Sequence, residues 1–304
     1  NDIASDGLYL IALKPDQQSF FVGMRSTFYR IGMITGQGLI VVIAGNLEQK
    51  LSDPAQAWSW TMVGVGALML TLTGVNYLST PKVIEARVAK EDQPSFGKVF
   101  STFFTKKNIG LSLGFVLLYR LGESQLVKMA SPFFLDSREA GGLGLSTTEV
   151  GFIYGTLGVI ALLAGGILGG ILISRDGLGK WMMPMAFAIN APNIGYIFLS
   201  WLQPEHVVFA TTVVFIEQLG YGFGFAAFMV FLIFLAEGIF KTAHYALATG
   251  FMAMGMMLPG MLSGYMQQWL GYPGFFVWVV IATIPGFVMA YVVKYPREFG
   301  KKNS

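Results

Sequence analysis

The sequence predicts an all-α protein, a polytopic bundle of helices that crosses a membrane several times. The chain has 304 residues, of which 54% are hydrophobic and 12% are charged, and its mean hydropathy is +0.60. Soluble domains carry about 25% charged residues, roughly twice this share. The hydrophobic residues form long stretches, and about 20 consecutive apolar residues are enough to cross a bilayer core as a helix.

Eight stretches are predicted as full membrane spans. In order they are Phe20–Ala44, Trp58–Leu78, Ile109–Leu135, Val150–Ile173, Trp181–Leu202, Val207–Leu235, Tyr245–Leu270 and Phe275–Val293. Residues 1–13 are interpreted as the tail of a ninth span. The sequence opens abruptly, with neither an initiator Met nor a signal-peptide pattern, so we expect a fragment of a longer protein.

Lysine and arginine are distributed unequally between alternate connections. Cytoplasmic connections of membrane proteins are enriched in these residues. One side holds only Lys50 and Arg138. The other side, which we therefore assign to the cytoplasm, holds Lys14, Lys82, Arg87, Lys90, Lys98, Lys106, Lys107, Arg175, Lys180, Lys241, Lys294, Arg297, Lys301 and Lys302.

The longest cytoplasmic connection, Ser79–Asn108, places four phenylalanines among lysines. Phe96, Phe100, Phe103 and Phe104 have the spacing of a short amphipathic helix at the membrane surface. The alternative is a solvated basic linker. The connection separates a part with two full spans from a part with six.

Several functional classes are not supported by the composition. A net charge of +3 without a basic cluster does not suggest nucleic-acid binding. The absence of cysteine excludes disulfides and thiolate metal sites, and His206 and His244 have no second ligand at a metal-binding spacing. No cofactor or metal is expected. The pattern Gly-x-Ser-x-Gly around Ser112 suggests an intramembrane hydrolase only as a weaker alternative, because it opens a membrane helix instead of following a strand.

Glycines recur at a spacing of four residues inside the spans. Such spacing lets two membrane helices approach closely. The pairs are Gly32/Gly36, Gly151/Gly155, Gly165/Gly169, Gly166/Gly170, Gly220/Gly224 and Gly260/Gly264. Pro192, between Asn190 and Asn193, and Pro259, beside Gly260, could each free backbone groups toward a cavity. The alternative is that both are ordinary kinks, since proline and glycine are common in membrane helices.

The third span contains three of the few intramembrane charges. A buried charge costs about 2.5–3.5 kcal/mol on insertion scales, so it is usually paired or lines a pathway. Arg120 and Lys128 fall on one helix face with Ser124, and Glu123 is placed to pair with Arg120. We expect the remaining positive charge, on Lys128, to face the interior of the bundle.

Further polar residues lie in the first and sixth spans and near the start of the chain. Arg30 and Gln37 share a face of the first span, Glu217 lies in the sixth, and Asp2 and Asp6 are one turn apart. One interpretation is a set of salt bridges that hold the bundle together. The other is a binding site for an anionic substrate with a protonatable acid for coupling.

Several segments in a shared order resemble AmpG-type muropeptide permeases. These belong to the major facilitator superfamily, close to its acetyl-coenzyme-A transporter branch. The segments are Asn1–Gly7, Arg25–Met33, Leu118–Glu123, Glu149–Leu172, Glu217–Gly222 and Ala243–Leu247. The resemblance implies a twelve-helix carrier without its first three helices and part of the fourth. Residues 1–78 then belong to the N-terminal half, 79–108 to the connection and 109–304 to the C-terminal half.

The resemblance also implies a function. We expect a secondary transporter, not an enzyme, that imports muropeptides across the cytoplasmic (inner) membrane by proton symport and alternating access. Acetyl-coenzyme A, peptides or sugar conjugates are the alternative cargoes. Its predicted partners are the anionic glycopeptide, protons and the lipid bilayer.

Site residues divide between two predicted roles. Substrate binding is assigned to Arg30, Gln37, Arg120, Lys128 and Asn190, and proton coupling to Glu217, Glu123, Asp2 and Asp6. Arginine suits bidentate contact with carboxylate or phosphate groups, whereas lysine acts as a point charge. Lys128 has no counterpart in the permease pattern.

Overall fold

The computed structural model describes residues 2–34, 40–51, 53–79 and 95–302, and these residues form helices and turns without any strand. The all-α prediction is therefore confirmed. The chain divides into two units, one made of Asn1–Ser26 with Gln93–Ser304 and the other of Thr27–Asp92.

Five helical segments among the described residues are long and apolar enough to cross a membrane, judged by length and composition. They are Pro54–Ser79, Thr147–Asp176, Leu178–Leu202, Val207–Ala236 and Lys241–Val292.

The smaller unit contains the second half of α2 (Pro15–Ile34) together with α3 (Ile40–Leu51) and α4 (Pro54–Ser79). Asp53 starts α4 by accepting the backbone N–H of Ala55 at 2.9 Å. Apolar side chains surround α4, yet it buries only Ala57 and Thr61. A helix that is apolar on every face belongs in lipid or among other helices.

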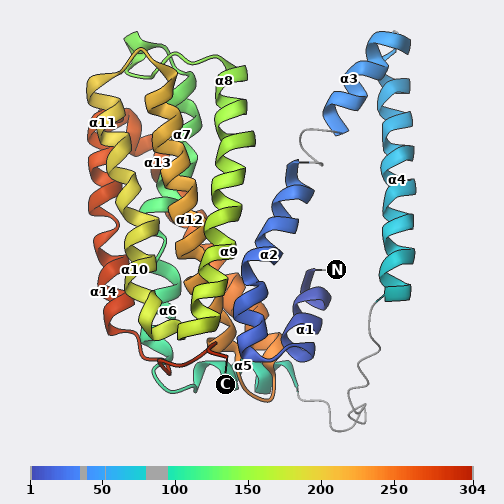
Figure 1. Ribbon diagram of the computed structural model, residues 1–304, viewed down its shortest axis with the longest axis vertical. Helices are drawn as coiled ribbons and strands as arrows, with labels where there is room; N and C mark the ends of the chain where they lie inside the picture. Colours follow the sequence, from blue (N-terminus) through green and yellow to red (C-terminus); the bar gives the residue numbers. More distant parts are fainter. Residues whose placement is uncertain (1, 35–39, 52, 80–94, 303–304) are drawn as a thin grey trace. The chain divides into compact units, whose positions relative to one another are not determined.

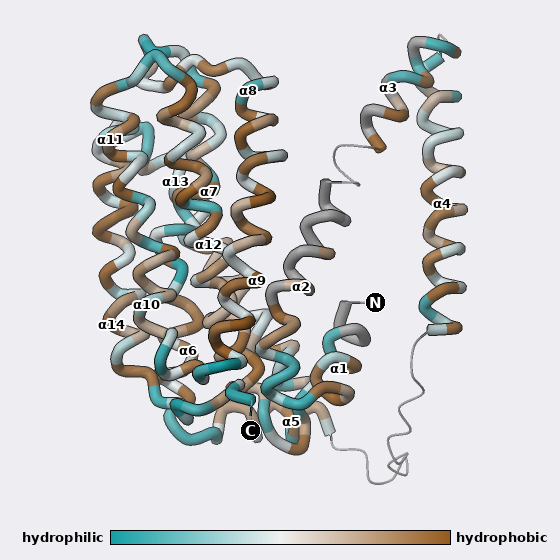
Figure 2. The backbone as a smooth tube through the Cα atoms, in the orientation of Figure 1, coloured by the Kyte–Doolittle hydropathy of each residue, from teal (hydrophilic) through white to brown (hydrophobic). Residues whose placement is uncertain are grey.

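The larger unit is a bundle whose long helices run side by side (Figure 1). Its helices are α1 (Asp2–Ala12), the start of α2, α5 (Phe96–Phe104), α6 (Ile109–Leu118), α7 (Leu121–Leu135), α8 (Thr147–Phe152), α9 (Val159–Asp176), α10 (Leu178–Asn190), α11 (Ile194–Leu202), α12 (Val207–Ala236), α13 (Lys241–Ile281) and α14 (Ile284–Val292). Hydrophobic residues run along these helices, and hydrophilic ones gather at the turns and along the C-terminal segment (Figure 2).

Most helix boundaries fall near the predicted ones. A capping box of Ser146 and Glu149 starts α8, and the chain turns between the last two predicted spans at Gly271, whose φ is +66°. The first predicted span corresponds to α2 and α3, and the residues between them, 35–39, lie outside the described part of the chain.

Three predicted spans need correction because they are interrupted inside the membrane-length segment. The third breaks at Tyr119 and Arg120, the fifth passes through a 3₁₀ turn at Ala191–Asn193, and the last begins again after Thr283. The interruption of the fifth span contains Pro192, whereas Pro259 lies inside α13. The interruption follows from the chemistry of proline, which has no N–H to continue the helical ladder.

Close helix packing at glycine is confirmed where α9 crosses α12. A Cβ atom added at Gly165 would lie 2.1 Å from the carbonyl oxygen of Leu219, and one added at Gly222 would lie 2.1 Å from that of Leu162. Gly151 and Gly155 behave differently, since an added Cβ meets nothing within 4 Å. Their spacing therefore does not mark a helix contact in this structure.

The amphipathic helix predicted in the connection is present as α5. Ser95 caps it by accepting the backbone N–H of Lys98. Phe103 is fully buried and stacks on Phe251 of α13, whereas Phe96 is 80% exposed. One face of α5 thus packs on α13, and the other carries exposed aromatic side chains.

Two apolar cores follow one another along the bundle of the larger unit. The first core lies around Phe115, Phe228 and Phe231, and the second core lies around Phe133 and Phe276. Each long helix passes from one core to the other. Each of these helices therefore has a short stretch of residues between the two cores.

Candidate functional site

A layer of buried polar side chains lies between the two cores. On α7 it falls between Tyr119 of the first core and Leu126 of the second, and on α10–α11 between Ile189 and Tyr196. We call this group the polar layer, and its members are Arg120, Glu123, Ser124, Gln125, Asn190, Asn193, Glu217 and Thr283. It coincides with the three helix interruptions, where backbone groups are released from the helical ladder.

Arg120 and Glu123 form a buried ion pair at the start of α7. Nε of Arg120 donates to Oε2 of Glu123 at 2.7 Å, and Nη2 donates to Oε1 at 3.1 Å. The side chains are only 8% and 7% exposed. The predicted local pairing is therefore confirmed.

Aromatic rings of α12 complete the surroundings of Arg120. The hydroxyl oxygen of Tyr221 accepts from Nη2 at 2.7 Å, and the guanidinium carbon lies 4.7 Å from the ring centre of Phe225. Such rings attract a cation by their quadrupole. Carboxylate, hydroxyl and ring faces together offset the loss of water around this charge.

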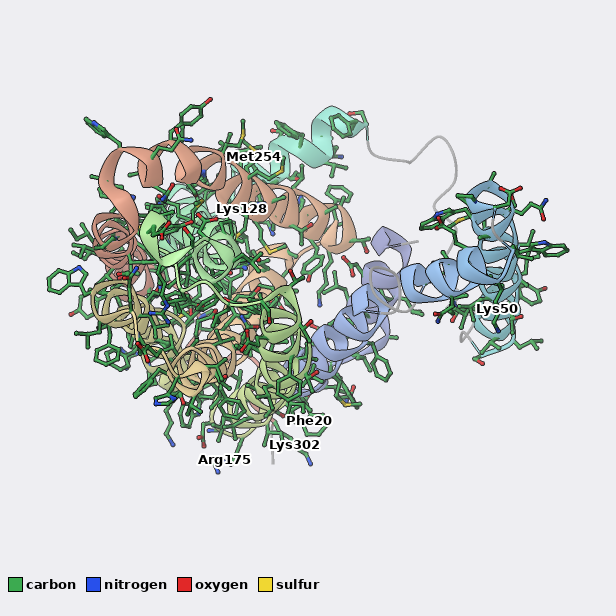
Figure 3. All side chains as sticks on the ribbon, turned by 90° about the horizontal axis from the view of Figure 1, so that it is seen from above. Phe20, Lys50, Lys128, Arg175, Met254 and Lys302 are labelled. Carbon is green, nitrogen blue, oxygen red and sulfur yellow. The ribbon has the colours of Figure 1, made fainter. Side chains whose placement is uncertain are left out.

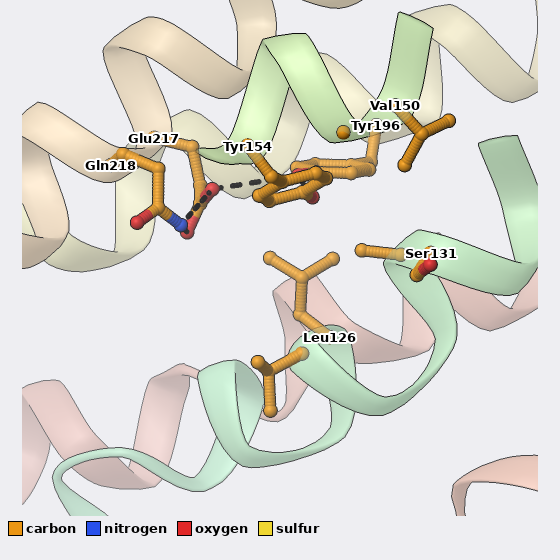
Figure 4. Close-up of a pocket in the computed structure, with 10 residues that line it drawn as sticks. Leu126, Ser131, Val150, Tyr154, Tyr196, Glu217 and Gln218 are labelled. Carbon is orange, nitrogen blue, oxygen red and sulfur yellow. Dashed lines mark hydrogen bonds between the residues drawn. The ribbon is translucent and has the colours of Figure 1, made fainter. Parts of the chain in front are cut away.

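Glu217 lies on α12 at the inner end of a pocket (Figure 4). Its carboxylate accepts from Nε2 of Gln218 at 2.9 Å and from the Tyr196 hydroxyl at 3.5 Å. The hydroxyl oxygens of Tyr154 and Tyr196 are 2.8 Å apart. A connected set of polar groups therefore surrounds a carboxylate that is only 6% exposed.

The pocket has a volume of about 310 Å³ and is formed by four helical segments of the larger unit. Leu126, Val127 and Ala130 of α7 and Val150 of α8 give it apolar walls, and its polar lining includes Tyr154, Tyr196, Glu217 and Gln218. An apolar pocket with a few convergent polar groups is the usual form of a small-molecule site.

Asn190 and Asn193 flank the 3₁₀ turn within the polar layer. Nδ2 of Asn190 donates to the carbonyl of Ala186 at 2.9 Å. Oδ1 of Asn190 and both amide atoms of Asn193 are buried without a protein partner. Buried amide groups of this kind are normally satisfied by water or a ligand, so this part of the layer suits polar contact with a bound molecule.

Lys128 is exposed in the described structure, although it follows buried Ser124 by one helical turn. Its stem lies against α13, where a Cβ added at Gly260 would lie 3.3 Å from Cε of Lys128 (Figure 3 labels Lys128). A long lysine side chain can pack its stem in this way while its charged end reaches a more polar region.

Of the remaining predicted site residues, the structure describes the side chain of Asp6. Asp6 is buried in α1, whose Gly7 contacts Thr242 at the start of α13. Asp2 and Arg30 lie in α1 and α2, with side chains outside the described part, and Gln37 lies outside it altogether.

Sequence reasoning missed the tyrosines of the site. Tyr196 donates to the Glu217 carboxylate, Tyr154 shares a hydrogen bond with Tyr196, and Tyr221 accepts from the Arg120 guanidinium. The sequence gives only a weak indication that these tyrosines belong to a site, because tyrosine is also common as an ordinary packing residue. Ser112 is buried inside α6, where no strand-to-helix turn presents it as a nucleophile.

Comparison with known proteins identifies relatives along nearly the whole chain. The chain is 26% identical to the anhydromuropeptide permease of Escherichia coli K12 over 99% of its own length and 59% of that protein. It is 25% identical to "Putative transporter AmpG 4" of Rickettsia conorii over 96% of its own length and 68% of that protein. The chain thus spans about three fifths of the Escherichia coli relative.

These relatives confirm the resemblance to AmpG-type permeases, and with the apolar helices they identify a multi-pass membrane protein. The family model of the Major Facilitator Superfamily matches residues 9–260, which is most of the chain. The chain therefore belongs to the Major Facilitator Superfamily.

Proposed function

We propose that the protein imports anhydromuropeptides across the inner membrane by proton symport. The name of the Escherichia coli relative supports the cargo class, an anionic glycopeptide. The observation that carries the proposal is the polar layer, with buried Arg120, Glu123 and Glu217 between two apolar cores. Buried charges at this depth typically mark substrate or ion pathways.

Alternating access is the proposed mode of movement. Carriers of this kind place substrate and coupling-ion sites near the bilayer midplane, on helices that are interrupted there. The breaks beside Arg120, Asn190 and Thr283 have this character. In the proposal the two halves rock around the polar layer and expose it to one side at a time.

The positively charged and amide residues are assigned to the cargo. Arg120 offers a planar fork that suits a carboxylate or phosphate, and the cargo would share or replace its contact with Glu123. Lys128, next to pocket-lining Val127, supplies an exposed point charge, and Oδ1 of Asn190, which has no protein partner, supplies a hydrogen-bond acceptor. Arg30 and Gln37 remain proposed contacts from the other half.

The acidic residues are assigned to the proton. Glu217 is the primary candidate because its carboxylate is buried, lines the pocket and receives hydrogen bonds from neutral groups, Tyr196 and Gln218. A buried carboxyl that lines a pocket is placed to exchange a proton with a bound molecule or with solvent in the pocket. Glu123 is held by Arg120 and is a secondary candidate, together with Asp2 and Asp6.

Uptake by the full-length protein in membrane vesicles tests the proposal. We expect an imposed inward proton gradient to drive accumulation of labelled anhydromuropeptide, and a protonophore to abolish it. Unlabelled acetyl-coenzyme A, a peptide and a sugar conjugate serve as competitors. Accumulation that does not depend on the proton gradient would contradict symport. If one of the competitors inhibits uptake more strongly than unlabelled anhydromuropeptide does, that compound is the better cargo.

A further inference from the structure

A segment that follows α14 lies against one end of the larger unit. We call this segment, Lys294–Lys302, the strap. Three backbone hydrogen bonds hold it to α9 and α10, from Leu178 N to Phe299 O at 3.0 Å, from Gly179 N to Arg297 O at 2.8 Å and from Lys302 N to Ser174 O at 2.7 Å. Since the first N–H groups of a helix have no partner within it, the strap satisfies the start of α10.

Side chains and glycines fix the strap on this surface. Phe299 packs edge-on against Phe234 of α12, with ring centres 5.4 Å apart. A Cβ added at Gly179 would lie 2.6 Å from Cβ of Arg297, and Gly177 has a φ of +86°. The two glycines therefore give the strap room against the start of α10.

The strap also meets α2, where Gly300 lies against Ser19. Gly300 is buried at a φ of +79°, and a Cβ added there would lie 2.1 Å from Oγ and 3.2 Å from Cβ of Ser19. The hydrogen bonds described for the strap go to α9, to α10 or to the strap itself. Its attachment is therefore unequal, strong toward α9 and α10 and limited to van der Waals contact toward α2.

Packing of α2 on α9 occurs beside this contact. Ser19 is fully buried, and a Cβ added at Gly170 of α9 would lie 2.8 Å from the backbone oxygens of Ser19 and Phe20. This end of the bundle carries Lys180, Arg297 and the other basic residues of the side assigned to the cytoplasm. In the described structure, α2 and α9 are therefore in close contact at that end, around Ser19.

We propose that the strap is a latch on the cytoplasmic end of the carrier. The proposal rests on the proposed function, in which α2 belongs to one rocking half and α9–α10 to the other. The strap stays on α9–α10 throughout the cycle. Gly300 contacts Ser19 in the state in which the cytoplasmic end of the carrier is closed. The two residues separate when that end opens and releases cargo.

A disulfide tests whether this contact must open. The chain contains no cysteine, so Ser19→Cys with Gly300→Cys introduces one defined pair. The Cβ separation of 3.2 Å is close to that of a disulfide, about 3.5–4.5 Å. In the full-length protein, with any other cysteine replaced, oxidation is expected to lower uptake of labelled anhydromuropeptide by about tenfold or more, and reduction to restore it.

The matched control joins the strap to the half that carries it. Ser174→Cys with Lys302→Cys cross-links residues joined by a backbone hydrogen bond. Because those parts move together, we expect oxidation of this pair to leave uptake unchanged. Three outcomes would contradict the latch. The oxidised Ser19–Gly300 pair could retain full uptake, it could fail to cross-link while the control pair does, or both pairs could lose uptake equally.

A measurement without cargo separates the latch from the proposed function. Cysteine at Ser19 alone is buried when the end is shut and should react slowly with a thiol reagent. Deleting Gly300–Lys302 should raise its rate of reaction, whereas Lys294→Ala, an exposed change in the strap, should not. If the deletion leaves the rate unchanged, the strap is no latch, whichever cargo the protein carries.

Discussion

At the scale of single residues, the site holds charged side chains that are almost fully buried. Transfer of a charge into a medium of low dielectric is costly unless partners replace its hydration. The partners of Arg120 include Glu123, the Tyr221 hydroxyl and three ring faces, and those of Glu217 include Tyr196 and Gln218. Hydrogen bonds and ring faces thus replace part of the hydration of each charge.

Arg120→Ala is expected to destabilise the protein by leaving Glu123 buried and unpaired. Removal of one partner of a buried ion pair costs about 3–5 kcal/mol in the free energy of unfolding. The double variant Arg120→Ala with Glu123→Ala should recover part of this loss, because no charge is stranded. Thermal unfolding in detergent measures both. A double variant less stable than Arg120→Ala would show that Glu123 has other important partners.

Glu217→Gln is expected to abolish uphill accumulation in the full-length protein and to leave exchange of substrate partly intact. The amide keeps the shape and hydrogen bonding of the side chain but carries no exchangeable carboxyl proton. Uptake against a gradient and counterflow in vesicles measure the two activities. Glu205→Gln, an exposed change, is the control. Normal accumulation by Glu217→Gln would restrict Glu217 to a structural role.

At the scale of elements, glycine decides how closely α9 and α12 approach. Their backbones meet at Gly165 and Gly222, where even a methyl group would overlap a carbonyl oxygen of the partner helix. This closeness matters for the site, because α12 carries Glu217, which lines the pocket. Four-residue spacing alone did not reveal which glycines make such contacts.

Gly165→Ala is expected to lower the free energy of unfolding by about 1–3 kcal/mol, the usual cost of overpacking a well-packed interface. Gly151→Ala is the matched control, since its added methyl group meets nothing within 4 Å. It should be neutral or slightly stabilising, because alanine favours helix more than glycine does. Chemical or thermal unfolding measures both, and equal effects would contradict the described crossing of α9 and α12.

Lys106, between α5 and α6, gives a prediction about pH. Its Nζ donates to the carbonyls of Leu235 and Glu237 at the end of α12, the second at 2.7 Å. Burial lowers the pKa of Lys106 to about 8, against the smaller opposing effect of Glu237. Above that pH the unfolded chain still holds a proton that the folded one has lost, so the contribution of Lys106 to stability rises until the unfolded pKa is passed.

Lys106→Gln isolates this contribution. As pH rises from about 7.5 to 10, the unmodified protein should gain stability relative to the variant, because only the unmodified protein has the shifted lysine. The difference in unfolding midpoint across this range is the measurement. Lys107→Gln, which changes an exposed neighbour, should show no such trend. A constant difference for Lys106→Gln would place its pKa at the ordinary value.

At the scale of the whole molecule, orientation in the membrane follows from the distribution of lysine and arginine. Single cysteines at Lys90 and Lys180 should be shielded from an impermeant thiol reagent in intact cells, whereas one at Ala140 should react. Permeabilised cells, in which all three positions should react, are the control. The reverse pattern in intact cells would invert every assigned side.

Much of the architecture was predictable because it depends on local properties. Span positions follow from runs of apolar residues, and the start of α8 and the turn at Gly271 follow from residue types with strong backbone preferences. The pairing of Arg120 with Glu123 was also predictable, since a separation of three residues brings two side chains together on a helix.

The sequence by itself determined that this protein is a helical membrane protein and that its buried charges are few. Hydropathy, length and charge act along the chain, so they are readable from it. Only the tertiary structure decided that Glu217 meets Tyr196 and Gln218 in a pocket, that Lys128 is exposed and that the strap lies against α2. These outcomes depend on which helix faces meet, and in lipid that choice is made by packing and polar contacts between distant residues, not by hydrophobicity.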